Sequence, residues 1–211
     1  MISKQLRLDV IRAVIVLGGN APAPERIAVW AKAADVLIGA DSGADSVIKA
    51  GLEPMVIGDL DSTQLNHNER QVIQINDQNT TDLEKSLEWL DGQSESVEIC
   101  VAGSEGNRLD HVLNSLSTLS YRGTPTWLLM EKGIGILTGE ITMAWPTFGT
   151  VSIIPFHQTV ISATGLQWAL ERTELLIGGK TSISNEIIAS GEFTIHDGTA
   201  LIQWQNDFCP W

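Results

Sequence analysis

The stretch VLIGADSGADSVIKAGLEPMVIGDLD, residues 36–61, contains the alternation on which the fold of this chain depends. Residues 36–41 and 55–61 are short apolar runs that end in polar residues, a pattern typical of buried strands. Between them, residues 43–51 have the pattern of a short helix that ends at Gly51. A strand, a helix and a second strand in succession indicate two parallel strands of one covered sheet.

The same alternation continues on both sides of this stretch. Further strands are predicted at residues 13–19, 71–75 and 97–103, and further helices at residues 24–34, 80–92 and 108–123. The helix that begins near residue 80 has a capping box of Thr81 and Glu84, which satisfies backbone N–H groups at a helix start. Residues 1–122 are therefore predicted to form an α/β domain with a mostly parallel sheet.

The sequence pattern changes after Gly123. Short β-type runs follow, separated by glycine and other turn residues, and no pattern of a long amphipathic helix occurs among them. We therefore expect residues 123–211 to form a second, all-β domain, either an antiparallel sandwich or a barrel.

The charge of the chain limits its partners. The 211 residues carry a formal net charge of −13, which argues against nucleic acids and anionic membranes as partners because both would be repelled. An anionic substrate would need accompanying cations or locally placed basic residues. Cys100 and Cys209 form no CxxC or metal-ligand pattern, which is typical of reduced thiols. Since no secretory signal or bilayer-spanning run is recognised either, we expect a cytoplasmic location.

Acidic side chains follow the predicted strands of the first domain. Asp41 follows the second strand, Asp59 and Asp61 end the third, and Asp82 and Asp110 lie at the starts of the helices after the fourth and fifth. Each one alone has an ordinary interpretation as a turn former or helix cap. Because the carboxyl ends of parallel strands meet at one edge of the sheet, together they would concentrate negative charge there. Mg²⁺ prefers carboxylate oxygens and commonly bridges phosphates, so the sequence predicts a magnesium–nucleotide site at this edge.

Glycine and basic residues near these acids are compatible with a phosphate ligand. GSEGNR, residues 103–108, would let backbone N–H groups approach an anion at a helix start, and Arg108 could bind it with its forked guanidinium. Lys85, three residues after Asp82 on the same helix face, could reach the same place, although it could equally be a solvated surface lysine. His111 taken alone is more typical of a packed or surface histidine. The Walker motif GxxxxGK[ST] does not occur in the sequence.

Five segments, in this order, resemble the thiamine pyrophosphokinase (thiamine diphosphokinase) family. They are ADSGADSVIKAGLEPMVIGDLDS (40–62), DQNTTDLEKSL (77–87), GSEGNRLDHVLNSL (103–116), GLQWAL (165–170) and SISNE (182–186). Each segment alone is unspecific, whereas all five together are a strong signal. The resemblance implies a Rossmann-like α/β nucleotide-binding domain followed by a β-sandwich, and a homodimer whose thiamine pocket lies at the subunit interface. It also implies a Mg²⁺-dependent reaction in which ATP and thiamine give thiamine diphosphate and AMP.

The resemblance also implies roles for individual residues. The acids that would surround Mg²⁺ are Asp41, Asp59, Asp61 and Asp82. The residues that would contact the nucleotide or its phosphates are Asp41, Gln78, Lys85, Arg108, Asp110, His111 and Asn114. The implied catalytic residues are Asp59, Asp61, Asp82 and Arg108, and no general base is obvious among them.

The matched segments of the second domain would bind the vitamin. Trp168 would stack on the cationic thiamine, and Ser184 and Asn185 would form hydrogen bonds with its pyrimidine. A core or turn tryptophan and a polar hairpin turn are the structural alternatives for these positions. Trp127, Trp145 and Trp204 are expected to be core or turn residues.

Other functions remain compatible with the same acids. A pyrophosphokinase acting on another heterocyclic alcohol, such as a hydroxymethyl pterin, would share the nucleotide-binding half but would not need Trp168 and SISN. A regulatory protein that binds a magnesium nucleotide without transfer is expected to lack an acid or Arg108, and neither is missing. A metal-dependent phosphohydrolase would use water as the acceptor and would need no deep acceptor pocket.

Overall fold

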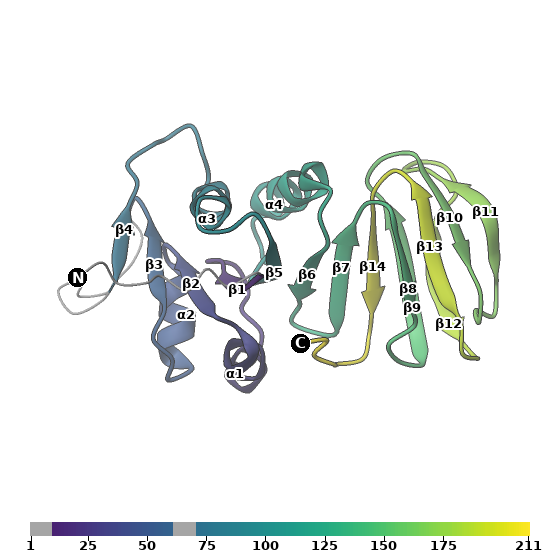
Figure 1. The fold of residues 1–211 in the computed structure, drawn as a ribbon, viewed down its shortest axis with the longest axis horizontal. Helices are drawn as coiled ribbons and strands as arrows, with labels where there is room; N and C mark the ends of the chain where they lie inside the picture. Colours follow the sequence, from purple (N-terminus) through teal and green to yellow (C-terminus); the bar gives the residue numbers. More distant parts are fainter. Residues whose placement is uncertain (1–9, 61–70) are drawn as a thin grey trace. The chain divides into compact units, whose positions relative to one another are not determined.

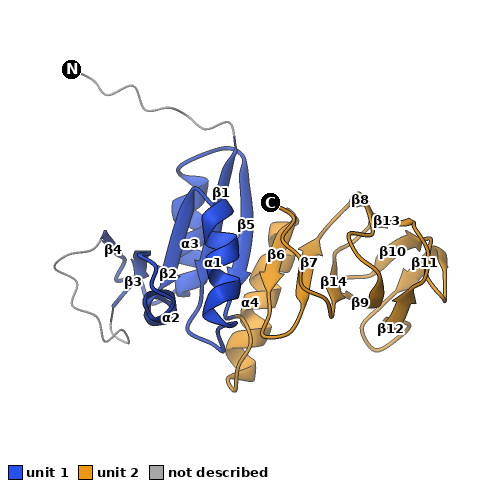
Figure 2. Ribbon diagram, turned by 90° about the horizontal axis from the view of Figure 1, so that it is seen from below, with its two compact units in different colours: residues 1–103 blue, residues 104–211 orange. Residues whose placement is uncertain are grey.

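The computed structural model describes residues 10–60 and 71–211, and these residues form two compact units that divide between Gly103 and Ser104 (Figure 2). We call them unit 1 and unit 2. Unit 1 is an α/β unit and unit 2 is dominated by antiparallel strands, so the predicted fold class is confirmed. No helix in the described part of the chain is long and apolar enough to cross a lipid bilayer.

Unit 1 is built on a parallel sheet whose strands lie in the order β5–β1–β2–β3–β4 (Figure 1). These strands are β5 (Val97–Ala102), β1 (Ile11–Val16), β2 (Val36–Ala40), β3 (Met55–Gly58) and β4 (Val72–Gln74). In β1 the four residues from Ala13 to Val16 have no exposed surface, which is why its sequence is a continuous apolar run. The parallel direction places the carboxyl ends of β2, β3 and β4 at the same edge of the sheet.

Helices cover both faces of this sheet. In Figure 1, α1 (Pro24–Ala33) and α2 (Gly43–Lys49) lie on one side of the strands and α3 (Asp82–Asp91) lies on the other. The predicted capping box at the start of α3 is confirmed, because Glu84 N–H donates to Thr81 Oγ1 at 3.3 Å and Thr81 N–H donates to Glu84 Oε2 at 2.7 Å. This cap fixes the first turn of α3 and therefore the position of Asp82.

Unit 2 begins with α4 (Leu109–Arg122) and continues as antiparallel strands in two layers. One layer has the order β12–β9–β14–β7–β6 and the other has the order β11–β10–β13–β8. The strands are β6 (Thr126–Leu129), β7 (Ile134–Thr138), β8 (Ile141–Ala144), β9 (Gly149–Pro155), β10 (Thr159–Ala163), β11 (Leu170–Leu175), β12 (Ser182–Ile187), β13 (Glu192–Asp197) and β14 (Ala200–Trp204). Their inward side chains share one core that includes Val151, Ile161, Phe193 and Trp204, as in a β-sandwich.

The two units divide one helix earlier than the domain boundary expected from sequence. The sequence pattern assigns α4 to the first domain because α4 continues the alternation of strands and helices. In the structure α4 packs against β7 and is grouped with unit 2. That residues 1–122 and 123–211 are the domains of this chain stays a prediction.

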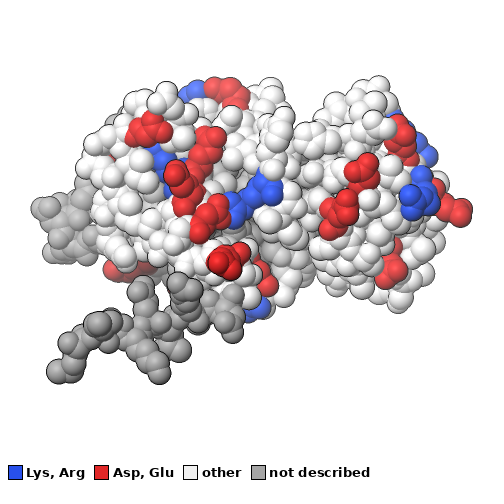
Figure 3. Space-filling view, turned by 45° about the horizontal axis from the view of Figure 1, so that its top comes forward, with Lys and Arg blue, Asp and Glu red and all other residues white. Residues whose placement is uncertain are grey.

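Acidic side chains are prominent on the surface. The face drawn in Figure 3 shows more acidic than basic side chains, in keeping with the net charge of −13. Any anionic ligand of this chain therefore needs local positive charge, and the buried lysine described below is one source of it.

Candidate functional site

The predicted site residues fall into three groups in the structure. The first group lies in unit 1, at or near the carboxyl edge of its sheet, and consists of Asp41, Asp59, Gln78, Asp82 and Lys85. A second group, at the start of α4, and a third, on and near β12, lie in unit 2. Asp61, which is also predicted to bind the metal, lies outside the described residues.

Asp41 is held in an unusual backbone conformation directly after β2. Its φ angle is +45°, a region that aspartate tolerates better than most side chains, and it is only 5% exposed. The backbone N–H of Asp41 donates to the carbonyl oxygen of Ile57 at 2.8 Å, which ties it to β3. Two residues later, a Cβ on Gly43 would collide with the carbonyl oxygen of Val16, so only glycine lets α2 begin this close to β1. The turn therefore places Asp41 firmly at the sheet edge.

Asp41 and Asp82 meet at Gly58, the last residue of β3. A Cβ added to Gly58 would lie 3.0 Å from Cβ of Asp41 and 3.1 Å from Oδ1 of Asp82. One acid follows β2 and the other opens the helix after β4, yet both border the same small space. The convergence expected from the strand order is therefore present for these two acids.

Lys85 provides a buried positive charge beside Asp82. Its Nζ lies 2.9 Å from Asp82 Oδ1, and the Lys85 side chain is 3% exposed whereas that of Asp82 is 31% exposed. Burial by itself lowers the pKa of Lys85, but the hydrogen bond and charge of Asp82, with the charges of Asp59 and Asp77, raise it above its ordinary value. Lys85 therefore stays protonated at neutral pH. The alternative of a solvated surface lysine is wrong.

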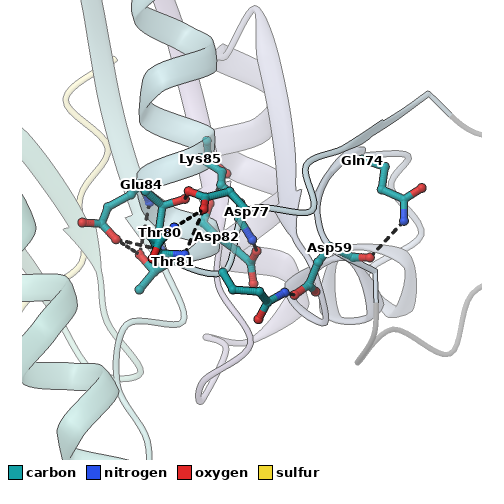
Figure 4. A network of polar contacts seen from close by, with 11 residues as sticks. Asp59, Gln74, Asp77, Thr80, Thr81, Asp82, Glu84 and Lys85 are labelled. Atoms are coloured by element: carbon teal, nitrogen blue, oxygen red, sulfur yellow. Dashed lines mark hydrogen bonds and ion pairs between the residues drawn. The ribbon is translucent and has the colours of Figure 1, made fainter.

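A residue of the loop before α3 also binds the side chain of Asp59, near Asp82 and Lys85 in the set of polar contacts drawn in Figure 4. Gln78 Nε2 donates to Asp59 Oδ2 at 2.9 Å, and Gln74 Nε2 donates to the backbone carbonyl oxygen of Asp59 at 3.3 Å. The amide of Gln78, which is predicted to contact phosphate, thus orients a carboxylate in this structure.

Asp77 organises the turn before α3 and is not among the predicted site residues. Its carboxylate accepts hydrogen bonds from the backbone N–H of Asn79 at 3.0 Å and from the hydroxyl of Thr80 at 2.7 Å. These bonds, led by the one from the Asn79 backbone, hold the pKa of Asp77 below its usual value. The sequence signal was available, because an aspartate that bonds the backbone two residues later is a common turn former.

The acids of unit 1 are compatible with a Mg²⁺ ion that is shared with phosphate. Within residues 10–60 and 71–211, no three His, Cys, Asp or Glu side chains are gathered closely enough to hold a metal by themselves. Proteins commonly bind Mg²⁺ through one or two carboxylates and leave the other positions to water and substrate phosphates. Asp41 and Asp82, which both approach Gly58, would form such a partial set of ligands. The assignment of four acids to the metal stays a prediction.

The start of α4 carries an exposed, forked ion pair. Arg108 Nε donates to Asp110 Oδ1 at 3.0 Å and Arg108 Nη2 donates to Asp110 Oδ2 at 2.7 Å, with side chains 71% and 63% exposed. The remaining predicted residues of this group, His111 and Asn114, are exposed on α4, where Asn114 shares a helix face with Asp110. Arg108 therefore keeps its donors at the surface, and a phosphate would compete with Asp110 for them.

We expect the carboxyl group of Asp110 to titrate at a pKa of about 2, chiefly because of the hydrogen bond from Arg108. The pKa is depressed on folding, so any stabilisation by this pair is present above the ordinary pKa of about 3.9 and is lost as pH falls through about 2. NMR titration of the Asp110 side chain tests this, and Arg108→Gln should return the pKa toward about 3.9. Arg122→Gln, at the other end of α4, should leave it unchanged. If the pKa of Asp110 stayed at about 2 in Arg108→Gln, that result would contradict the pairing.

The third group brings Trp168 and Asn185 together. Trp168 lies between β10 and β11 with 59% of its surface exposed, whereas Trp127, Trp145 and Trp204 pack in the core of unit 2 as expected. Asn185 is 2% exposed, and its carboxamide is bonded to both the backbone N–H and the backbone carbonyl of Trp168. Ser184 is exposed and has a φ angle of +54°. The hydrogen bonds predicted from Ser184 and Asn185 to a pyrimidine stay predictions, and the one from Asn185 would have to replace a bond that its carboxamide already makes within the protein.

Two family models match this chain in consecutive regions. One is described as "Thiamin pyrophosphokinase, catalytic domain" and matches residues 28–127. The other is described as "Thiamin pyrophosphokinase, vitamin B1 binding domain" and matches residues 140–199. The first region contains the acids around Gly58, and the second contains Trp168 and Asn185.

Individual relatives agree with these matches. The chain is 29% identical to thiamin pyrophosphokinase 1 of Caenorhabditis elegans over 157 residues, and 28% identical to thiamine pyrophosphokinase 1 of Arabidopsis thaliana over 179 residues. These alignments include 66% and 74% of this chain but only 64% and 66% of the respective relatives, so the chain spans somewhat less than two thirds of their length.

Solved structures support the fold. A thiamin pyrophosphokinase from Geobacillus thermodenitrificans is 24% identical and superposes with a TM-score of 0.76, covering 93% of this chain and 98% of that one. The yeast thiamin pyrophosphokinase is 16% identical, with a TM-score of 0.76 and coverage of 94% and 87%. With both family models matched in order along the sequence, the chain belongs to the thiamin pyrophosphokinase family.

Proposed function

We propose that this chain is a thiamine diphosphokinase, which transfers a pyrophosphoryl group from ATP to the hydroxyl of thiamine. The observation that carries the proposal is the pairing of Asp41 and Asp82 about Gly58, with the buried cation of Lys85 beside them, inside the region matched by the catalytic-domain model. Carboxylates next to a buried cation suit a magnesium–phosphate ligand better than a bare anion, which the net charge of −13 would repel.

In the proposed reaction, the hydroxyl oxygen of thiamine forms a bond to the β-phosphorus of ATP. The bond between the β-phosphorus and the oxygen that bridges to the α-phosphorus breaks, so AMP leaves with that oxygen. The hydroxyl proton passes to solvent, and the products are AMP and thiamine diphosphate. Because the transferred group is strongly anionic, catalysis depends mainly on positioning and on charge neutralisation.

The residues of unit 1 would position the triphosphate. Asp41 and Asp82, with Asp59 and Asp61, are the residues that would hold Mg²⁺, and the bound ion would neutralise phosphate charge. Lys85 keeps Asp82 in place and offsets part of the acidic charge before a ligand arrives. Gln78 orients Asp59 through its hydrogen bond.

The residues at the start of α4 would contact the nucleotide. Arg108 is suited to a phosphate because its guanidinium is exposed and can bind two oxygens at once. Asp110 holds that guanidinium in a defined orientation. His111 and Asn114, exposed on the same helix, would bind the rest of the nucleotide.

The acceptor would bind in unit 2, against the exposed ring of Trp168. A flat cationic heterocycle such as thiamine gains both stacking and cation–π attraction on an indole face. We further propose that the protein acts as a cytoplasmic homodimer with this pocket at the subunit interface. The exposed apolar side chains of Ile183 and Ile188, on and after β12, support a contact with a second copy.

The decisive experiment follows the phosphorus atoms. With Mg²⁺, thiamine and ATP labelled in the β-phosphate, we expect the label to appear in thiamine diphosphate, whereas label in the α-phosphate should remain in AMP. The two products should form in equal amounts, and EDTA should stop the reaction. A hydroxymethyl pterin in place of thiamine should give no AMP. Formation of ADP or of free phosphate instead of AMP would refute the proposal.

A further inference from the structure

The carboxamide of Asn185 is fully occupied within the protein. Its nitrogen donates to the carbonyl oxygen of Trp168 at 2.8 Å and to Ser182 Oγ at 3.2 Å. Its oxygen accepts from the N–H of Trp168 at 3.2 Å and from the N–H of Glu186 at 2.9 Å. Together these four bonds use both donors and both lone pairs of the amide.

A β-bulge explains why this side chain points inward. In the pairing of β12 with β9 the register shifts between Ser182 and Asn185, and the positive φ of Ser184 lies inside the shift. The backbone N–H of Ser184 donates to Ser152 Oγ at 3.0 Å, which fixes the bulge. Strict alternation from buried Ser182 would bury Ser184, but the extra residue buries Asn185 in its place.

The segment that carries Trp168 runs beside the end of β12. The N–H of Gln167 donates to the carbonyl oxygen of Glu186 at 2.8 Å, and the N–H of Ile188 donates to the carbonyl oxygen of Gly165 at 2.9 Å. These are backbone bonds of an antiparallel pairing. At the next residue, Trp168, the side chain of Asn185 binds both backbone groups. Both backbone polar groups of Trp168 are therefore held by Asn185, an arrangement that we call the clamp, while 59% of the surface of Trp168 stays exposed.

We propose that Asn185 is a positioning residue that acts on the acceptor through Trp168. By holding both peptide groups of Trp168, it fixes the direction in which the indole face is presented to a flat, cationic heterocycle. A stacking surface that is already ordered loses less conformational entropy on binding. The proposal rests on the proposed function for the identity of the acceptor, but the clamp itself can be tested without any ligand.

The first test measures amide hydrogen exchange in the ligand-free protein by NMR. In Asn185→Ala we expect the Trp168 amide to exchange at least about tenfold faster, since its acceptor is removed. The Gln167 amide should be nearly unchanged, because its acceptor is the backbone oxygen of Glu186. Asn206→Ala is the matched control, since Asn206 also bonds a loop carbonyl of unit 2, that of Phe148. Unchanged exchange at Trp168 in Asn185→Ala would overturn the clamp.

Asn185→Asp covers the case in which the alanine variant does not fold. Aspartate keeps the oxygen acceptors for the N–H groups of Trp168 and Glu186 but loses both donors. Protection of the Trp168 amide should therefore survive in Asn185→Asp. Loss of that protection in a folded variant would also overturn the clamp.

The second test is a double-mutant cycle on acceptor kinetics. Asn185→Ala and Trp168→Ala should each raise the KM for thiamine about tenfold, with little change in the KM for ATP. The double variant should be no worse than Trp168→Ala alone, because Asn185 acts only through the ring. Multiplied effects would show a separate contact of Asn185 with the acceptor and would refute the positioning role. Lack of thiamine turnover in the unmodified protein would refute the proposed function and leave the exchange test valid.

Discussion

Asp82→Asn is expected to lower kcat/KM by about 100- to 1000-fold while the protein stays folded. The substitution removes one charge from the point at Gly58 where Asp41 and Asp82 meet, but it preserves the size of the side chain. It also preserves an oxygen that can accept a hydrogen bond from Lys85 Nζ, which lies 2.9 Å from Asp82 Oδ1 in the unmodified protein. Steady-state kinetics with both substrates, together with thermal unfolding, measure the two effects.

Two further variants separate the effect of the Asp82 charge on activity from the effect of Asp82 on stability. In Asp82→Ala, Lys85 remains buried without this partner, so we expect a loss of about 1–3 kcal/mol in the free energy of unfolding, moderated by the partial exposure of Asp82. Glu88→Gln, which neutralises an exposed acid on the same helix, should change neither activity nor stability appreciably. If Asp82→Asn retained activity within about threefold of the parent, Asp82 could not be a site residue.

Gly58→Ala is expected to lower kcat about 10- to 100-fold, because the new methyl group would occupy the space between the two acids. It would lie 3.0 Å from Asp41 Cβ and 3.1 Å from Asp82 Oδ1, so one acid or both must move by a few tenths of an ångström. Asp41 is buried and fixed by its backbone, so we expect Asp82 to move and its bond with Lys85 to lengthen. Kinetics in varied Mg²⁺ should show a higher metal requirement.

Gly51→Ala is the matched control for this substitution. Gly51 has a φ of +73° and no atom within 4 Å of an added Cβ, counted over the described residues. Its replacement should cost about 1 kcal/mol of stability through backbone strain without touching the acids. Equal kinetics for Gly58→Ala and Gly51→Ala would mean that the space at Gly58 does not matter for the reaction.

Some parts of the site could be read from residue order. Parallel strands deliver their carboxyl ends to one edge, so a polar residue after each strand predicts convergence without knowledge of any distance. Asp41 and Asp82 meet at Gly58 for this reason. The capping box at Thr81 was also predictable, because its residues are three positions apart and bond locally.

Other parts depend on how much of a side chain is exposed, which residue order does not give. Lys85 could be a surface lysine or a buried cation from sequence alone, and only its packing in unit 1 decides between them. Asn185 has the residue type of a ligand-binding amide, but the bulge at Ser184 turns it inward, where Trp168 uses its hydrogen bonds. A bulge shifts which residues face inward, and pattern reasoning that assumes strict alternation cannot detect it.

The order of strands and helices, the parallel sheet of unit 1 and the antiparallel strands of unit 2 could be predicted from residue order, because these follow from local periodicity and turn residues. Only the tertiary structure shows that Lys85 is buried against Asp82, that Asp41 and Asp82 both approach Gly58 and that Asn185 holds the backbone of Trp168. Each of these depends on distances between residues brought together by folding, and such distances are set by the packing of the whole unit rather than by neighbours along the chain.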